Sequence, residues 1–263
     1  IMKIIVLAGG LSTERDVSLS SAAGICRTLL EKGHDAFLLD VFMGLEHAPE
    51  NLEDVFTLPD HGLDIVKNIS TEEPDLAAVK ASRPDQSDCF FGPNVIELCR
   101  LADITFLGLH GGEGENGKLQ AAFDLLGIKY TGPDSLGCAV AMHKGVAKQI
   151  FLESGVDTPG GGTLYKNGSD LSYQSLGLTL PVVVKPCSGG SSIGVYIVNT
   201  DEEYQNALEE MSGEAVEYVR GIPVVKTFGQ SVFSFKRFRD SIKKYEKWTI
   251  SYTKDLRLPM MGY

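Results

Sequence analysis

Hydrophobic positions in the first part of the chain form two short apolar runs separated by a stretch of helical spacing. Residues 3–8 and 36–41 are the apolar runs, and residues 17–30 carry apolar side chains at helical intervals, with candidate N-caps at Ser12, Thr13 and Asp16. Glycines at 9–10 and 33 separate the three segments. The strand–helix–strand order predicts a parallel sheet covered on both faces.

The same pattern returns after residue 94. It predicts a helix over residues 95–101, a strand over 104–109, a helix over 118–126 and a short strand over 128–131. Residues 43–90 are polar, acidic and rich in proline, and they predict an insertion with one short helix at 75–81. These elements predict a Rossmann-like N-terminal domain over residues 1–135.

The second part of the chain has a different pattern. We expect one helix over residues 137–155, and then two strands, 180–185 and 192–198, that flank a glycine turn at 187–190 as a hairpin flap. A helix over 201–211, capped by Thr200-Asp201, follows, and residues 217–219 and 223–225 are possible strand fragments. The prediction is a central α+β domain over residues 136–221, followed by a tail over 222–263.

Charge is distributed unevenly along the 263 residues. The whole chain has a net charge of −11, but residues 226–263 hold nine Lys and Arg against three Asp and Glu. An acidic body argues against a nucleic-acid partner. No apolar stretch is long enough to cross a bilayer, so no membrane partner and a cytoplasmic location are expected. Five cysteines without a CxxC pair predict reduced, mostly buried thiols rather than a disulfide framework or a zinc site.

The first chemical motif is the glycine turn GGLSTE at residues 9–14. It lies at the carboxyl end of a predicted strand, where open α/β sheets bind ligands beside a helix N-terminus. We expect Glu14 and Ser18 to point into that crevice. A purely structural glycine turn is the alternative.

The second motif, LHGGEGENGK at residues 109–118, also follows a predicted strand. Its GxxxxGK spacing is that of a phosphate loop, but Leu119 offers no hydroxyl for a metal, and Glu113 and Glu115 would stand where phosphates must bind. A site for an amino-bearing group suits these carboxylates better. His110 is either a crevice residue or a core histidine.

The third motif is VKPCSGGSSIG at residues 184–194. A lysine that ends a strand, followed by a glycine–serine turn, supplies a fixed cation, backbone N–H groups and hydroxyls able to cover a triphosphate. An ordinary glycine hairpin with a surface lysine is the alternative. Lys144 lies in the helix after the first domain. Its position alone does not distinguish a functional lysine from an ordinary solvated one.

Taken in order, these motifs resemble the D-alanine:D-alanine ligases of the ATP-grasp superfamily, which include D-alanine:D-serine ligases. The resemblance covers residues 3–211 and rests on AGGxSxExxVS, LHG through Gln120, Tyr130-Thr131-Gly132, Met142-His143-Lys144 and VKP through Gly194. It implies an α/β fold in which a Rossmann-like parallel-sheet domain precedes a central α+β ATP-grasp domain. It also implies ATP and magnesium as cofactors, a homodimer, and D-alanyl-D-alanine made for peptidoglycan through a D-alanyl phosphate.

The resemblance also implies roles for individual residues. Glu14 is similar to the group that orients the first D-alanine and hydrogen-bonds Ser191, and His110 is similar to a contact near that substrate's carboxylate. Lys144 and Lys185 are similar to the two ATP-phosphate lysines. Gly190, Ser191 and Ser192 would close over the γ-phosphate and exclude water.

The chain departs from the family pattern in three places. His143 stands where the family usually has Asp. Residues 216–221 resemble a nucleotide-binding strand, but its glutamate positions hold Val216 and Pro223. Beyond Gly221 the resemblance stops, and no metal ligands of the family are found there.

The tail has three interpretations. It is a basic amphipathic helix, a divergent third domain, or the product of a truncated or out-of-frame coding sequence for the third domain. We favour the last of these. The functional hypothesis is an ATP-dependent D-alanine:D-alanine ligase. The alternatives are a D-alanine:D-serine ligase, a non-catalytic remnant that binds nucleotide or D-amino acid, and an interaction protein that acts through its tail.

Overall fold

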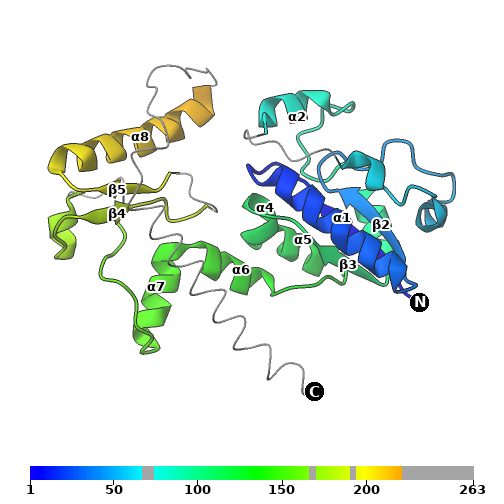
Figure 1. Ribbon diagram of the computed structural model, residues 1–263, viewed down its shortest axis with the longest axis horizontal. Helices are drawn as coiled ribbons and strands as arrows, with labels where there is room; N and C mark the ends of the chain where they lie inside the picture. The colour runs from blue at the N-terminus through cyan, green and yellow to red at the C-terminus, as the bar shows by residue number, and fades with distance from the viewer. Residues whose placement is uncertain (67–73, 166–169, 190–193, 221–263) are drawn as a thin grey trace. The chain divides into compact units, whose positions relative to one another are not determined.

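The computed structural model describes residues 1–66, 74–165, 170–189 and 194–220 (Figure 1). The backbone divides into two compact units, Ile1–Gly213 and Glu214–Tyr263. All of the described strands belong to the first unit. The predicted domain boundaries at 135 and 221 stay predictions.

A three-stranded parallel sheet organises the N-terminal part, as the sequence predicts. β1 (Lys3–Ala8) is central, with β2 (Asp35–Asp40) on one side and β3 (Ile104–Leu107) on the other. Ile5 of β1 is in register with Phe37 of β2 and Thr105 of β3. The strand expected at 128–131 is reduced to a single parallel bridge between Thr105 and Tyr130.

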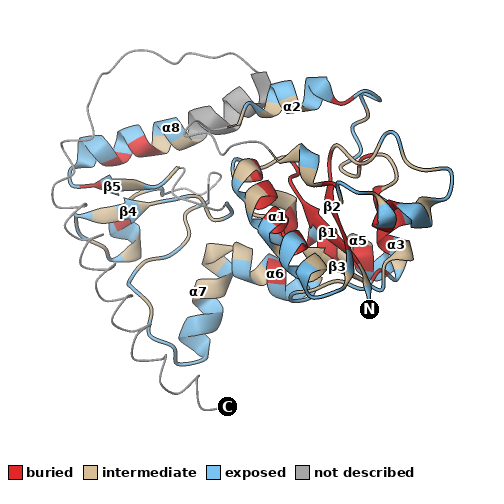
Figure 2. Cartoon of the chain, turned by 45° about the vertical axis from the view of Figure 1, so that its right-hand side comes forward, coloured by how far each residue is buried: buried red, intermediate tan, exposed pale blue. Residues whose placement is uncertain are grey.

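Both faces of this sheet are buried, which explains why its strands are continuous apolar runs (Figure 2). Ile5 and Leu7 face a cluster that includes α3 (Val95–Leu101) and α5 (Lys118–Leu126). Ile4 and Val6 face the opposite way, toward α1 (Arg15–Glu31). Because successive side chains of a strand point to opposite faces of the sheet, the apolar residues of β1 contribute alternately to two hydrophobic cores.

The start of α1 differs from the prediction. The helix begins at Arg15, its N-cap is Glu14, and no side chain caps it. The expected capping by Ser12, Thr13 or Asp16 is therefore wrong. Ser12 Oγ instead donates a hydrogen bond to the carbonyl of His110, 2.6 Å away.

The described residues of the predicted insertion form short helices and contribute to the core. Its elements are the 3-10 helices η1 (Leu52–Thr57) and η2 (Leu63–Ile65) and the predicted short helix, α2 (Leu76–Ser82). Asp75 caps α2 by accepting from the N–H of Ala78. Val55 and Phe56 of η1 are buried against the sheet.

The single helix expected at 137–155 is wrong, because the structure has two helices there. α6 (Ser135–Met142) and α7 (Lys144–Glu153) are separated at His143, whose backbone is extended. His143 Nδ1 accepts from the N–H of Val146, 3.2 Å away, and so caps α7. The histidine thus makes a capping contact of the kind that an aspartate side chain makes at an N-cap.

The expected hairpin is present, although its strands are shorter. β4 (Val182–Val184) pairs antiparallel with β5 (Tyr196–Val198). A small core of Tyr173, Val198, Tyr204 and Ala207 joins this hairpin to the 3-10 helix η3 (Tyr173–Leu176) and to α8 (Asp201–Arg220).

α8 is longer than the helix predicted over residues 201–211. Thr200 Oγ1 accepts from the N–H of Glu203 at 3.1 Å, so the predicted cap is confirmed. The helical backbone continues to Arg220, and the strand fragment expected at 217–219 is therefore wrong, as is the strand interpretation of 216–221. Two Ala and six Glu residues, all good helix formers, outweigh Gly213 in this segment. The fragment at 223–225 and the tail at 222–263 lie outside the described residues.

All five cysteines are free, as predicted, and three of them are buried. Burial raises the pKa of the Cys26 thiol to about 11 and that of the Cys99 thiol to about 12. Both thiols therefore stay protonated at neutral pH. Cys89 is exposed, and Cys187 is half-buried beside the third motif.

Candidate active site

The first two motifs meet in one crevice at the carboxyl ends of β1 and β3. Because these strands are parallel neighbours, the turn after β1 lies beside the turn after β3. Residues 9–12 and 109–111 line a narrow crevice together with Phe90, Glu113 and Gly114. The two motifs therefore meet at the edge of the sheet where the sequence predicts a crevice.

A buried ion pair fixes the glycine turn that forms one wall. Arg15 pairs with Asp40, the last residue of β2, and its second nitrogen donates to the carbonyl of Gly10 at 2.7 Å. A Cβ on Gly9, whose φ is +73°, would lie 2.5 Å from the Asp40 carboxylate. The turn thus needs glycine both for its backbone conformation and for the close approach of Asp40.

Sequence reasoning missed Arg15 and Asp40. Asp40 also accepts from the backbone N–H groups of Phe42 at 2.9 Å and Met43 at 3.1 Å, so its carboxylate ties the loop after β2 to the turn after β1. The available signal was a charged residue at the end of an apolar strand, with an arginine in the first turn of the preceding helix.

Ser18 is placed differently from the expectation that it points into the crevice. It is fully buried, and its hydroxyl accepts from the N–H of Gly9 at 3.0 Å and donates to the carbonyl of Gly108 at 2.8 Å. The hydroxyl therefore joins the ends of β1 and β3. This geometry favours a positioning role for Ser18, and its predicted contact with substrate stays a prediction.

We expect Ser18→Ala to lower the free energy of unfolding by about 1–3 kcal/mol, because two buried backbone groups lose their partner. Thr28→Ala is the matched control on the same helix, since Thr28 donates only to the carbonyl of Gly24 at an exposed position. Urea unfolding followed by circular dichroism measures both. Equal losses in the two variants would contradict the bridging role of Ser18.

Glu14 lies next to the turn that carries His110, and of these two residues only His110 lines the crevice. Glu14 is half-buried, and its Oε2 would lie 2.9 Å from a Cβ on Gly111, the residue after His110. The hydrogen bond from Ser12 to the His110 carbonyl holds the two motifs against each other. The structure thus brings a carboxylate from one motif next to the histidine turn of the other.

The segment with phosphate-loop spacing has an arrangement unsuited to phosphate. Residues Gly112–Glu115 form the one-turn helix α4, and Lys118 Nζ lies 3.4 Å from Glu113 Oε1. The lysine of the GxxxxGK pattern is thus paired with a carboxylate of the same loop. This contact agrees with the rejection of a phosphate loop.

The third motif brings Lys144 to the glycine turn that follows β4. The N–H of Lys144 donates to the carbonyl of Cys187 at 2.8 Å, and its Nζ donates to the carbonyl of Gly189 at 2.7 Å. Lys185 is exposed at the start of the same turn. Gly190, Ser191 and Ser192 lie outside the described residues, and so does the expected contact between Glu14 and Ser191.

Within the described ranges, no group of three or more His, Cys, Asp or Glu residues is placed to hold a metal ion.

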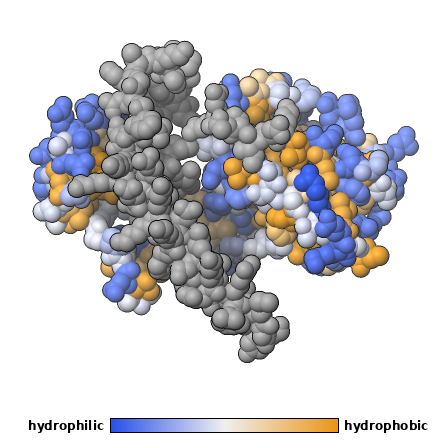
Figure 3. Space-filling model, in the orientation of Figure 1, coloured by the Kyte–Doolittle hydropathy of each residue, from blue (hydrophilic) through white to orange (hydrophobic). Residues whose placement is uncertain are grey.

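Among the described helices, none is long and apolar enough to span a bilayer. On the visible face, hydrophilic and hydrophobic residues of the described parts are interspersed (Figure 3).

A parallel-sheet domain with a glycine crevice, followed by an antiparallel hairpin whose glycine turn meets two lysines, is the architecture of the ATP-grasp class. Comparison with family models supports a more specific assignment. Residues 3–133 match the model described as the D-ala D-ala ligase N-terminus, and residues 167–222 match the D-ala D-ala ligase C-terminus. The chain belongs to the D-alanine–D-alanine ligase family.

Individual relatives agree with this assignment. The chain is 43% identical over 212 residues to the D-alanine–D-alanine ligase of Lacticaseibacillus casei, which covers 80% of this chain and 58% of the relative. The D-alanine–D-alanine ligase of Pediococcus pentosaceus is also 43% identical, and the match covers 80% of this chain and 59% of the relative. The chain therefore spans less than two thirds of the length of these relatives.

Solved structures show the same similarity. The D-alanine–D-alanine ligase of Bacillus anthracis complexed with ATP superposes with a TM-score of 0.56 at 26% identity, over 81% of this chain and 56% of that one. The VanG D-Ala:D-Ser ligase of Enterococcus faecalis superposes with a TM-score of 0.54 at 28% identity. The match covers 79% of this chain and 58% of the VanG chain.

Proposed function

We propose that the chain acts as an ATP-dependent D-alanine:D-alanine ligase that activates one D-alanine as an acyl phosphate. The observation that carries this proposal is the meeting of Glu14 and the His110 turn in a crevice of a chain that belongs to this family. The names of the relatives support the substrate, and the ATP complex of the B. anthracis ligase supports the nucleotide.

The crevice has the polarity that a small amino acid requires. The Glu14 carboxylate is a hydrogen-bond acceptor of opposite charge to a substrate ammonium group. His110 would lie near the carboxylate of the same substrate, where an imidazole N–H can donate. Both ends of a D-alanine zwitterion would then find a partner of suitable chemistry.

Lys144 and Lys185 would supply positive charge for the ATP phosphates. Lys144 is anchored through its backbone at the N-terminus of α7, so its ammonium group is held beside the turn at 187–189 rather than moving freely in solvent. A fixed cation stabilises charge that develops on the transferring phosphoryl group. Magnesium, which the family resemblance implies, would add counter-charge, but the described residues offer no ligand cluster for it.

The proposed reaction has two balanced steps. A carboxylate oxygen of the first D-alanine attacks the γ-phosphorus, the bond to the bridging oxygen breaks, and ADP leaves. The amine of the second D-alanine, having lost a proton, then attacks the carbonyl carbon, and inorganic phosphate leaves as the amide forms. The contribution of the chain is positioning and charge neutralisation.

The test is ADP release by the full chain with ATP, magnesium and D-alanine, together with mass-spectrometric detection of the dipeptide. We expect ADP and D-alanyl-D-alanine in equal amounts, and neither when D-alanine is replaced by L-alanine. Folded protein that binds ATP and D-alanine but forms no ADP would overturn the ligase assignment in favour of a binding role.

A D-alanine:D-serine ligase is the second candidate, favoured by the similarity to the VanG enzyme. Equimolar D-alanine and D-serine in the same assay distinguish the two. Predominance of the mixed dipeptide would support the second candidate. A cytoplasmic location, expected from the apolar pattern of the chain, and a homodimer, implied by the resemblance, belong to this proposal as well.

A further inference from the structure

Phe90 forms an apolar wall of the candidate crevice. A Cβ on Gly10 would lie 3.5 Å from Phe90 Cζ and equally 3.5 Å from Leu109 Cδ2, so the tip of the ring stands over the glycine turn. Phe90 is half-buried and comes from the segment after α2, which the sequence analysis treats as part of an insertion. The insertion therefore reaches the site.

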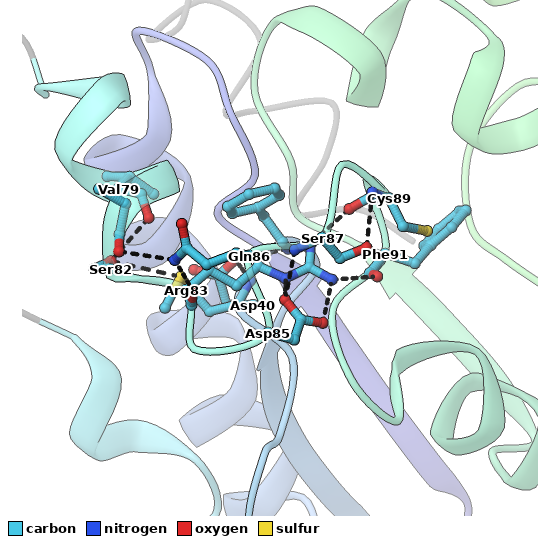
Figure 4. A network of polar contacts seen from close by, with 12 residues as sticks. Asp40, Val79, Ser82, Arg83, Asp85, Gln86, Ser87, Cys89 and Phe91 are labelled. Carbon is cyan, nitrogen blue, oxygen red and sulfur yellow. Dashed lines mark hydrogen bonds and ion pairs between the residues drawn. The ribbon is translucent and has the colours of Figure 1, made fainter.

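Arg83 holds the backbone on both sides of Phe90 (Figure 4). Its guanidinium donates to the carbonyl of Cys89 and, at 3.1 Å, to the carbonyl of Phe91. Arg83 is only 1% exposed, which is unusual for an arginine. Two carbonyls that flank one residue and share a single buried cation leave that residue little freedom to move.

The guanidinium of Arg83 is itself fixed by further contacts. Asp85 Oδ1 lies 2.7 Å from Arg83 Nε, and Asp85 Oδ2 accepts from a terminal nitrogen at 3.0 Å. The other face of the guanidinium lies over the Phe42 ring, 4.8 Å from its centroid. The hydrogen bond from Arg83 keeps the pKa of Asp85 below its usual range, so this pair stays charged at neutral pH.

The residues after Phe90 attach the segment to the sheet core. Phe91 stacks on Phe123 of α5 with 6.1 Å between ring centroids. Gly92 donates its N–H to the carbonyl of Val41 at 2.8 Å, and a Cβ at Gly92 would lie 2.5 Å from the carbonyl oxygen of Phe42. Phe90 is thus carried by a rigid support on both sides.

We infer that Phe90, held in place by Arg83, limits the size of the amino-acid side chain that the crevice admits. This inference rests on the proposed function. The aromatic ring and Leu109 lie against the Gly10 turn and leave this side of the crevice narrow, so a side chain longer than a methyl group would meet the ring. Arg83 is a positioning residue, since it acts through the backbone of Phe90.

The test is isothermal titration calorimetry of the full chain with D-alanine, D-2-aminobutyrate and D-norvaline. For the wild type we expect affinity to fall about tenfold or more from D-alanine to D-norvaline, the range typical for added methylenes in a fitted apolar pocket. Phe90→Ala and Phe90→Leu are expected to remove this difference. Phe151→Ala, at an exposed phenylalanine of α7, is the control and should keep the wild-type ranking.

A second variant tests the positioning role. Arg83→Lys keeps the charge, but a lysine cannot reach both carbonyls. We expect this variant still to bind D-alanine and, like Phe90→Ala, to show a smaller difference in affinity between D-alanine and D-norvaline. Arg100→Lys, at an exposed arginine of α3, is its control.

Two outcomes separate this inference from the proposed function. Wild-type protein that binds none of the three amino acids would overturn the proposed function. Wild-type protein that prefers D-alanine, with an unchanged ranking in folded Phe90→Ala and Phe90→Leu, would overturn the role of Phe90 alone.

Discussion

Arg15→Met is expected to lower the free energy of unfolding by about 3–5 kcal/mol, because it leaves the Asp40 carboxylate buried without its counter-charge. The side chains of Arg15 and Asp40 are 10% and 4% exposed, so solvent cannot replace the lost partner. The loss also frees the Gly10 carbonyl. Urea unfolding measures the change.

The exposed pair of Lys3 and Glu53 provides the matched control. Their side chains are 36% and 54% exposed, and their charged atoms lie 2.9 Å apart. Lys3→Met is expected to cost less than about 1 kcal/mol, as solvent-exposed pairs do. The double variant Arg15→Met with Asp40→Leu should recover part of the loss, since no buried charge remains. Equal effects of Arg15→Met and Lys3→Met would contradict the importance of the buried pair.

Lys144→Met is expected to abolish the stabilisation that ATP gives the protein. A ligand present at 100 times its dissociation constant stabilises the native state by about 2.7 kcal/mol, so the wild type should show a clear rise in melting temperature. Without Lys144 the turn at 187–189 loses the cation anchored to the Gly189 carbonyl. Thermal unfolding with and without ATP is the measurement.

Lys185→Ala should have a similar effect on the ATP shift, because Lys185 begins the turn that Lys144 contacts. Lys80→Met, at an exposed position of α2, is the control and should keep the full shift. An unchanged ATP shift in Lys144→Met and Lys185→Ala would contradict the assignment of these lysines to the phosphates.

Local pattern predicted the parallel sheet well, and it failed where tertiary contacts decide the structure. The run at residues 3–8 forms a strand because both of its faces find a core, which a continuous apolar run indicates. The break at His143 could not be predicted in the same way. A histidine is not a typical N-cap, and its capping contact with Val146 appears only in the folded backbone.

In the candidate site, too, some residues could be predicted from local pattern and others depend on tertiary contacts. Glycine turns and the residues next to them, such as Glu14 and His110, carry a signal in the sequence because they follow strands. Arg83 and Phe90 carry none, since they come from a polar stretch whose path depends on buried contacts with Phe42 and the carbonyls at 89 and 91. Ser18 was expected to point into the crevice, but the direction of its hydroxyl depends on Gly108, 90 residues away.

The most direct test of carboxylate activation follows the carboxylate oxygens of the substrate. The full chain would be incubated with ATP, magnesium and D-alanine carrying ¹⁸O in its carboxylate, and the released phosphate analysed by mass spectrometry. Attack of the carboxylate on the γ-phosphorus, followed by displacement at the carbonyl carbon, predicts one ¹⁸O atom in each phosphate released. Phosphate released in a D-alanine-dependent reaction but carrying no ¹⁸O would contradict an acyl-phosphate route.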